Sequence, residues 1–161
     1  MGAYYFDSSA LIKRYITEPG SAWVQTICDP TQNHQIFVAR ITSTEMLSAL
    51  AKSYRMQIMN EQQLMQLASL VLRDIQRQYQ QVPMHPSLYH SAGKFIITYA
   101  IKGLRAYDAI QLACALYANQ RFITQNQATL TFVTSDAILR AVAETAGLHA
   151  LDPISASDIS Q

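Results

Sequence analysis

Residues 3–9 read AYYFDSS, and this stretch determines the fold that we expect. Its first part, Ala3 to Phe6, is a short apolar run, which is typical of a buried strand. Asp7, Ser8 and Ser9 follow directly, and their side chains favour the first residues of a helix. The stretch therefore predicts a strand that passes into a helix, with an aspartate at the junction.

Similar junctions occur along the rest of the chain. Gln35–Ala39 and Thr131–Thr134 are candidate strands, Ser135 and Asp136 open the next helix, and residues 149–151 are the last short candidate strand. Helical patterns stand between these runs, at residues 10–16, 21–27, 42–55, 61–79 and 87–102, and in a segment that begins near residue 108. Strands that alternate with helices predict an α/β fold, with a mostly parallel sheet covered by helices on both faces.

Length and composition limit the classes of protein to consider. With 161 residues, half of them hydrophobic, we expect residues 1–161 to form a single domain. The net charge of +1 gives no global sign of nucleic-acid binding, and it does not exclude a local basic rim around an acidic pocket. Cys28 and Cys114 lie far apart, and no Cys-x-x-Cys pair indicates zinc. Neither a secretory signal nor a membrane-length apolar run is present, so we expect a cytoplasmic protein without membrane association.

Four acidic residues stand where helices begin. Asp7 and Asp136 each follow a candidate strand, Asp108 opens a helix, and Glu45 lies in the first turn of another. Ligands of open α/β sheets bind outside the carboxyl ends of the strands. Clustered carboxylates repel one another unless a cation lies between them, and Mg²⁺ and Mn²⁺ prefer oxygen ligands. The pattern therefore favours one acidic site that holds Mg²⁺ or Mn²⁺.

A simpler interpretation of the same acids remains open. Aspartate is a favoured helix N-cap, and acids in a first turn suit the helix dipole. Residues 42–45 have the form of a capping box, in which Glu45 would only complete the cap. Taken one at a time, the four acids do not separate these two interpretations.

The sequence around the acids resembles the PIN-domain family, especially the VapC-like toxins of bacterial toxin–antitoxin pairs. Residues 5–13 (YFDSSALIK) resemble the opening strand of that family and its first catalytic aspartate. Thr44 and Glu45, with Leu47 and Ala49, resemble its second motif. Residues 104–113 (LRAYDAIQLA) resemble the third and most specific motif, and residues 132–136 (FVTSD) the fourth. The four motifs occur in the family's order and cover nearly the whole chain.

This resemblance implies a PIN-like three-layer α/β/α sandwich and a Mg²⁺- or Mn²⁺-dependent ribonuclease, a hydrolase acting on RNA. The residues that match the catalytic and metal-binding acids are Asp7, Glu45, Asp108 and Asp136. Ser8, Ser9 and Thr134 match small hydroxyl residues of the family, and we expect them to orient the carboxylates or to cap helices.

Three basic residues lie close to the acids in sequence. Lys13 and Arg14 follow Asp7, and Arg105 precedes Asp108 by three residues. Lysine and arginine supply most sequence-independent contacts to nucleic-acid phosphates, so these three are candidate RNA contacts. The alternative is that each is a solvated surface charge.

Three functional hypotheses remain. In the first, the chain is the toxin of a two-component module, with an RNA substrate, a small antitoxin as partner and a homodimeric state. In the second it is a housekeeping RNA-processing nuclease, and in the third a non-cleaving RNA- or protein-binding module. The intact acids argue against the third. A gene for a small protein immediately upstream would separate the first from the second.

Overall fold

The computed structural model of the chain describes residues 2–125 and 129–159. Its centre is a five-stranded sheet in the order β3-β2-β1-β4-β5, and all neighbouring strands run parallel. The strands are β1 (Ala3–Phe6), β2 (Gln35–Ala39), β3 (Gln80–Val82), β4 (Thr131–Val133) and β5 (His149–Leu151). The expected parallel sheet is therefore confirmed, with β1 at its centre.

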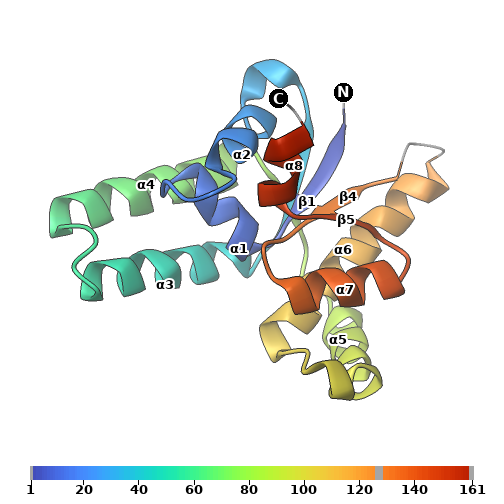
Figure 1. Cartoon of the computed structure of the whole chain (residues 1–161). Coiled ribbons are helices and arrows are strands. Elements are labelled where there is room, and N and C mark those ends of the chain that lie inside the picture. The colour runs from blue at the N-terminus through green and yellow to red at the C-terminus, as the bar shows by residue number, and fades with distance from the viewer. Residues whose placement is uncertain (1, 126–128, 160–161) are drawn as a thin grey trace.

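Helices cover both faces of this sheet (Figure 1). They are α1 (Ser8–Leu11), α2 (Ser21–Ile27), α3 (Thr42–Arg55), α4 (Glu61–Arg77), α5 (Pro86–Thr98), α6 (Ala106–Thr124), α7 (Ala137–Thr145) and α8 (Pro153–Ile159). Successive side chains of a strand point to opposite faces. Accordingly, Tyr5 of β1 packs in one core with α5, α6 and α7, whereas Phe6 packs in a second core with α1 to α4. This arrangement confirms the three-layer α/β/α sandwich.

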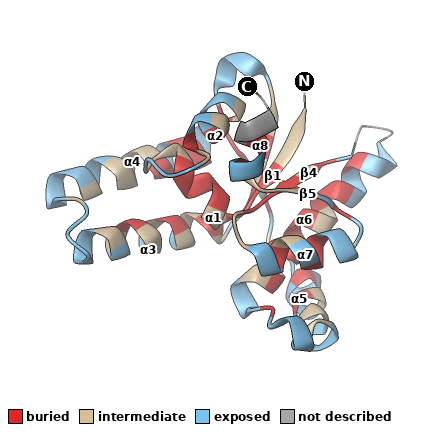
Figure 2. Ribbon diagram, in the orientation of Figure 1, coloured by how far each residue is buried: buried red, intermediate tan, exposed pale blue. Residues whose placement is uncertain are grey.

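Helices α3 and α4 extend from the body of the molecule as an antiparallel pair (Figure 1). Their buried residues lie toward the sheet, and the far end of the pair is exposed (Figure 2). Met56 and Ile58, in the connection between them, are exposed apolar side chains. Asn60 caps α4 in a reciprocal box, in which its side chain accepts from the Gln63 N–H and the Gln63 side chain accepts from the Asn60 N–H.

Two elements of the structure were not expected from the sequence. Strand β3 has only three residues at the edge of the sheet, and Gln80 and Gln81 are exposed, so no apolar run marks it. Helix α8 is a short helix that lies against α2.

The helix expected to end before Gly103 divides into α5 and a 3₁₀ turn, which Gly103 terminates with a φ of 72°. Among the residues that the structure describes, no helix is long and apolar enough to cross a bilayer.

The strand order explains where a ligand can bind. The chain proceeds from β1 to β2 and β3 on one side of the sheet, and β4 and β5 lie on the other side. The order reverses between β1 and β4, where Phe6 stands opposite Val133. A crevice forms at such a switch point, outside the carboxyl ends of the strands, because the following helices turn to opposite faces.

Candidate acidic active site

A hollow of about 270 Å³ lies at this switch point and contains the four acids expected from the sequence. Asp7 follows β1, Asp136 follows β4, Glu45 is on α3 and Asp108 is on α6. Ser8, Ser9 and Arg105 also line it, whereas neither Lys13 nor Arg14 does. Residues far apart in the sequence therefore meet in one place, where four carboxylates face a single arginine.

Asp7 is the most deeply buried of the four acids, with 3% of its surface exposed. Its Oδ1 accepts hydrogen bonds from the Ala10 N–H at 3.0 Å and the Ser9 hydroxyl at 2.9 Å, and the same hydroxyl lies 3.0 Å from Oδ2. Burial raises the pKa of Asp7 from 3.8 to about 7, and the hydrogen bonds offset only part of that effect. Asp7 is thus both a helix cap and a carboxyl group with no positively charged partner among the residues that the structure describes.

Asp136 caps α7 with one oxygen and binds Arg105 with the other. Its Oδ1 accepts from the Leu139 N–H at 2.9 Å, and its Oδ2 accepts from Nη2 of Arg105 at 2.8 Å. Asp108 is not a cap, because Arg105 is the N-cap residue of α6 and Asp108 lies inside the first turn. Its Oδ2 accepts from Nε of Arg105, also at 2.8 Å. Asp136 is therefore both a helix cap and a member of the acidic site. Asp108 belongs to the acidic site and is not a cap.

Glu45 does not complete a capping box, which corrects the simpler interpretation of residues 42–45. The N-cap of α3 is Ile41, which makes no side-chain cap. The Glu45 carboxylate instead accepts a short hydrogen bond from the side-chain amide of Gln111. Burial raises the pKa of Glu45, while this hydrogen bond and one from Ser8 lower it. A tertiary contact between α3 and α6 has replaced the local cap.

Gln111 is a site residue to which sequence reasoning gave no role. It is 1% exposed, and its amide nitrogen donates to Thr42 as well as to Glu45. Its amide oxygen accepts from the Tyr5 hydroxyl at 2.8 Å. The signal in the sequence was a polar residue within the apolar face of α6, three positions after Asp108.

The three small hydroxyl residues lie beside the acids. The Ser9 hydroxyl contacts Asp7 and also accepts from the Ser135 N–H at 3.0 Å, which links the ends of β1 and β4. Thr134 accepts from the Asp136 N–H at 3.0 Å, and its hydroxyl lowers the pKa of Asp7 by hydrogen bonding. Ser8 acts on Glu45 in the same way.

Two of the three basic candidates have other partners. The Lys13 side chain is 6% exposed, and its amine pairs with Glu18 at 3.0 Å. Arg14 donates to the Cys28 carbonyl oxygen and the Tyr79 hydroxyl, and it pairs with the buried Asp74 at 3.4 Å. Both residues belong to a 3₁₀ turn, and the guanidinium of Arg14 contacts Asp74 and Gln78 at the C-terminal end of α4. Lys13 and Arg14 thus lie outside the acidic hollow and are engaged by other groups of the chain, and their contact with RNA phosphates stays a prediction.

The acids fit a hard divalent cation by the chemistry of their donors. All four offer carboxylate oxygens, which Mg²⁺ and Mn²⁺ prefer. Burial raises the pKa of Asp7, and a cation beside this carboxyl would favour its charged form. As the side chains stand in the described ranges 2–125 and 129–159, no three His, Cys, Asp or Glu residues are grouped closely enough to hold an ion. Arg105 occupies one oxygen of Asp108 and one of Asp136. The carboxylate oxygens are therefore the type of ligand that a divalent cation needs, but two of the four acids are paired with Arg105.

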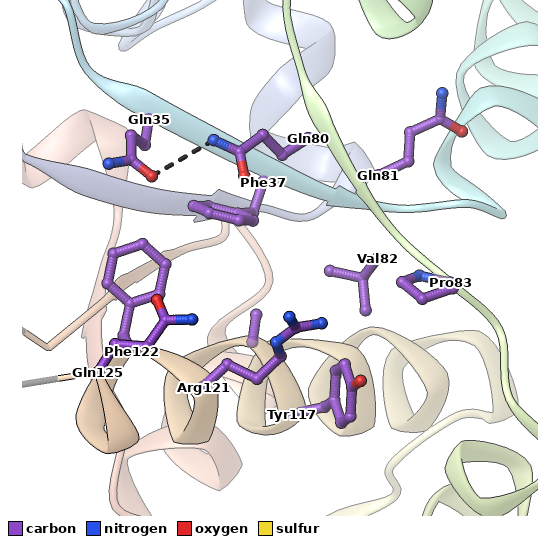
Figure 3. A pocket seen from close by; sticks show the side chains of 11 residues that line it. Gln35, Phe37, Gln80, Gln81, Val82, Pro83, Tyr117, Arg121, Phe122 and Gln125 are labelled. Atoms are coloured by element: carbon purple, nitrogen blue, oxygen red, sulfur yellow. Dashed lines mark hydrogen bonds between the residues drawn. The ribbon is translucent and has the colours of Figure 1, made fainter. Parts of the chain in front are cut away.

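A second hollow, of about 250 Å³, lies between β3 and the C-terminal half of α6 (Figure 3). The rings of Phe37 and Phe122 meet edge to face there at 5.2 Å, and the guanidinium of Arg121 lies 5.9 Å from the ring of Tyr117. None of the described side chains that line it is acidic. It therefore offers no carboxylate ligands for a cation among its described lining residues, and Arg121 is an exposed arginine of α6 outside the acidic hollow.

Comparison with known proteins gives one family and several similar structures, including two crystal structures. The family model of the PIN domain matches residues 4–143. The crystal structure of PAE2754 from Pyrobaculum aerophilum is similar at 19% identity and a TM-score of 0.57, over 99% of this chain and 94% of that one. The crystal structure of FitAcB from Neisseria gonorrhoeae is similar at 14% identity and a TM-score of 0.57, over 93% and 97%. None of the curated proteins matches the chain. At such identities the two structures establish a shared fold only.

Proposed function

The chain belongs to the PIN-domain family, and from this premise we propose that it is a metal-dependent endoribonuclease that hydrolyses RNA phosphodiester bonds. PIN domains are generally nucleases, so the fold is of a nuclease type. One observation supports the activity of this chain: four carboxylates from separate elements line a single hollow at the switch point of the sheet. Such a site suits hydrolysis of a phosphodiester better than binding alone, since clustered carboxylates repel an RNA phosphate unless cations are bound.

We propose that Asp7, Glu45, Asp108 and Asp136 hold Mg²⁺ or Mn²⁺. When bound, the cation supplies neutralisation of phosphate charge and activation of water. The residues of the chain that surround the acids hold them in place, because Ser9 binds Asp7 and Gln111 binds Glu45. Carboxylates that are fixed in this way need little rearrangement during the reaction.

Arg105 is the basic residue that we propose for contact with RNA. Its side chain is 72% exposed at the rim of the acidic hollow, so a phosphate can reach it. A bidentate guanidinium suits two phosphate oxygens.

The biological role that we propose is that of the toxin in a toxin–antitoxin pair. Its support is the VapC-like form of the four motifs, above all residues 104–113. A small antitoxin would be the partner, and exposed apolar side chains such as Met56, Ile97 and Ile101 offer surfaces for it or for a homodimer. We further propose that residues 1–161 form one PIN-like domain and that the protein is cytoplasmic, in keeping with its two free buried cysteines.

The nuclease proposal is tested by incubating the purified protein with labelled total RNA or transfer RNA. Parallel reactions contain Mg²⁺, Mn²⁺ or a chelator. Asp7→Asn removes a charge from the hollow, and Asp29→Asn is the matched control because Asp29 is an exposed aspartate outside it. We expect discrete cleavage that requires the cation, persists in Asp29→Asn and disappears in Asp7→Asn.

Other outcomes favour the other hypotheses. RNA that is bound but never cut, by folded protein with cation present, would replace the nuclease with a binding module. Cleavage that persists in Asp7→Asn would place the active site elsewhere. A nuclease whose expression does not slow growth in cells would favour housekeeping RNA processing.

A further inference from the structure

One guanidinium bridges two acids of the hollow. Nε of Arg105 donates to Oδ2 of Asp108, and Nη2 donates to Oδ2 of Asp136, each at 2.8 Å. Asp108 belongs to the first turn of α6, and Asp136 is the N-cap of α7. Arg105 therefore occupies, with its positive charge, one oxygen of each of two acids that we propose as cation ligands.

The other two acids have no cationic partner among the described residues. Asp7 is bound by the Ser9 hydroxyl and the Ala10 N–H, and Glu45 by the amide of Gln111. The positive charge in the hollow is thus confined to one half of it, around Asp108 and Asp136. A divalent cation that also uses the two bridged oxygens must displace the guanidinium, because cations repel each other and the oxygens are engaged.

Arg105 is well placed for such displacement. Its backbone is fixed as the N-cap of α6, but its side chain is 72% exposed, against 16% for Asp108 and 22% for Asp136. Leaving the acids therefore costs the arginine little, since solvent-exposed ion pairs are weak. The acids remain in the hollow, where a cation can take the vacated oxygens.

We propose that Arg105 is an internal counter-ion that competes with the divalent cation for Asp108 and Asp136. This inference rests on the proposed function, because the cation belongs to that function. Arg105 raises the cation concentration at which the hollow fills and preserves the arrangement of α6 and α7 until then. Its release places a free guanidinium beside the filled site, where RNA phosphates arrive.

The experiment is a calorimetric titration of the full-length protein with Mn²⁺, in the absence of RNA. Arg105→Gln should bind Mn²⁺ about threefold to tenfold more tightly than the original protein, the factor expected from releasing two exposed ion pairs. Arg105→Lys should fall between the two, because one ammonium keeps the charge but lacks the fork that bridges both acids. The control is Arg121→Gln, a change of the same type at the exposed arginine of α6 outside the hollow, and it should leave the affinity unchanged.

Three results would overturn the inference. Equal or weaker Mn²⁺ binding by Arg105→Gln, in protein whose unfolding temperature is unchanged, would mean that the arginine does not compete. A lowered unfolding temperature with unchanged Mn²⁺ affinity would mean that Arg105 only joins α6 to α7. If neither protein bound Mn²⁺, both this inference and the proposed cation site would be wrong.

The cleavage assay separates this inference from the nuclease proposal. Suppose that Arg105→Gln binds Mn²⁺ more tightly but the original protein cuts no RNA. This result would support the competition and refute the nuclease proposal. RNA cleavage by the original protein, together with equal Mn²⁺ affinities, would support the nuclease and refute the competition.

Discussion

Replacing Asp7 with asparagine should stabilise the metal-free protein, and by more as the pH rises. Asp7 is 3% exposed, and burial raises its pKa from 3.8 to about 7. The folded protein therefore holds a proton on this carboxyl more tightly than the unfolded chain does. The stability that belongs to the group is fully present below pH about 4 and is lost as the pH rises through about 7.

The size of the effect follows from the same pKa values. Each pH unit between the two pKa values removes about 1.4 kcal/mol of stability, so the loss between pH 5 and pH 7 is about 3 kcal/mol. Asparagine has no charge to lose, and its side-chain oxygen can still accept the capping bond from Ala10. The difference in free energy of unfolding between Asp7→Asn and the original protein should therefore grow by about 3 kcal/mol over this range.

The assay is thermal unfolding of both proteins in chelator at about pH 5 and pH 8. For a chain of this length, about 3 kcal/mol corresponds to about 6–12 °C in the difference between the two melting temperatures. Asp29→Asn is the control, because hydrogen bonds from Thr31 lower the pKa of Asp29 and its titration lies below the assay range, so its melting-temperature difference should not change between the two pH values. A melting-temperature difference between Asp7→Asn and the original protein that does not change with pH would refute the reasoning.

Three further changes test the contacts around the site. Ser9→Ala removes hydroxyl hydrogen bonds that lower the pKa of Asp7, so the NMR titration midpoint of that carboxyl should rise, and a fall would contradict this. Arg14→Met deprives the buried Asp74 of one partner, so the free energy of unfolding in denaturant should fall by about 1–3 kcal/mol while RNA cleavage is retained. Loss of cleavage in folded protein would instead indicate that Arg14 contributes to RNA binding or cleavage. Gln111→Leu leaves two buried hydroxyls without their partner amide and should cost about 2–3 kcal/mol, so an unchanged unfolding midpoint would show that they find other partners.

Much of the fold was predictable because its central elements carry strong local patterns. Strands β1, β2 and β4 are apolar runs, and α2 was expected with the bounds that it has. Strand β3 was missed, since a three-residue edge strand with exposed glutamines has no apolar pattern. It is a strand because it pairs with β2, which the local sequence does not reveal. The capping box at residues 42–45 is not formed because α3 begins one residue earlier, with Ile41 as N-cap, and the side chains of Thr42 and Glu45 both bind Gln111 instead.

The site shows the same division between local and distant information. Asp7 and Asp136 were predictable as neighbours, because each follows a parallel strand and adjacent parallel strands end at the same edge. Lys13 and Arg14 follow Asp7 closely in sequence, yet neither lines the hollow, because Lys13 pairs with Glu18 and Arg14 with Asp74.

The sequence by itself determined the family, the alternation of strands and helices, and the identity of the four acids, because these depend on residue types at short range. Only the tertiary structure decided which charges meet: Arg105 bridges two of the acids, Arg14 binds Asp74, and Gln111 joins α6 to Glu45. A side chain's partner depends on the directions in which several elements present their groups and on the water removed between them. Neither is encoded in the spacing of residues along one element, so the electrostatics of the hollow emerge only when the chain is folded.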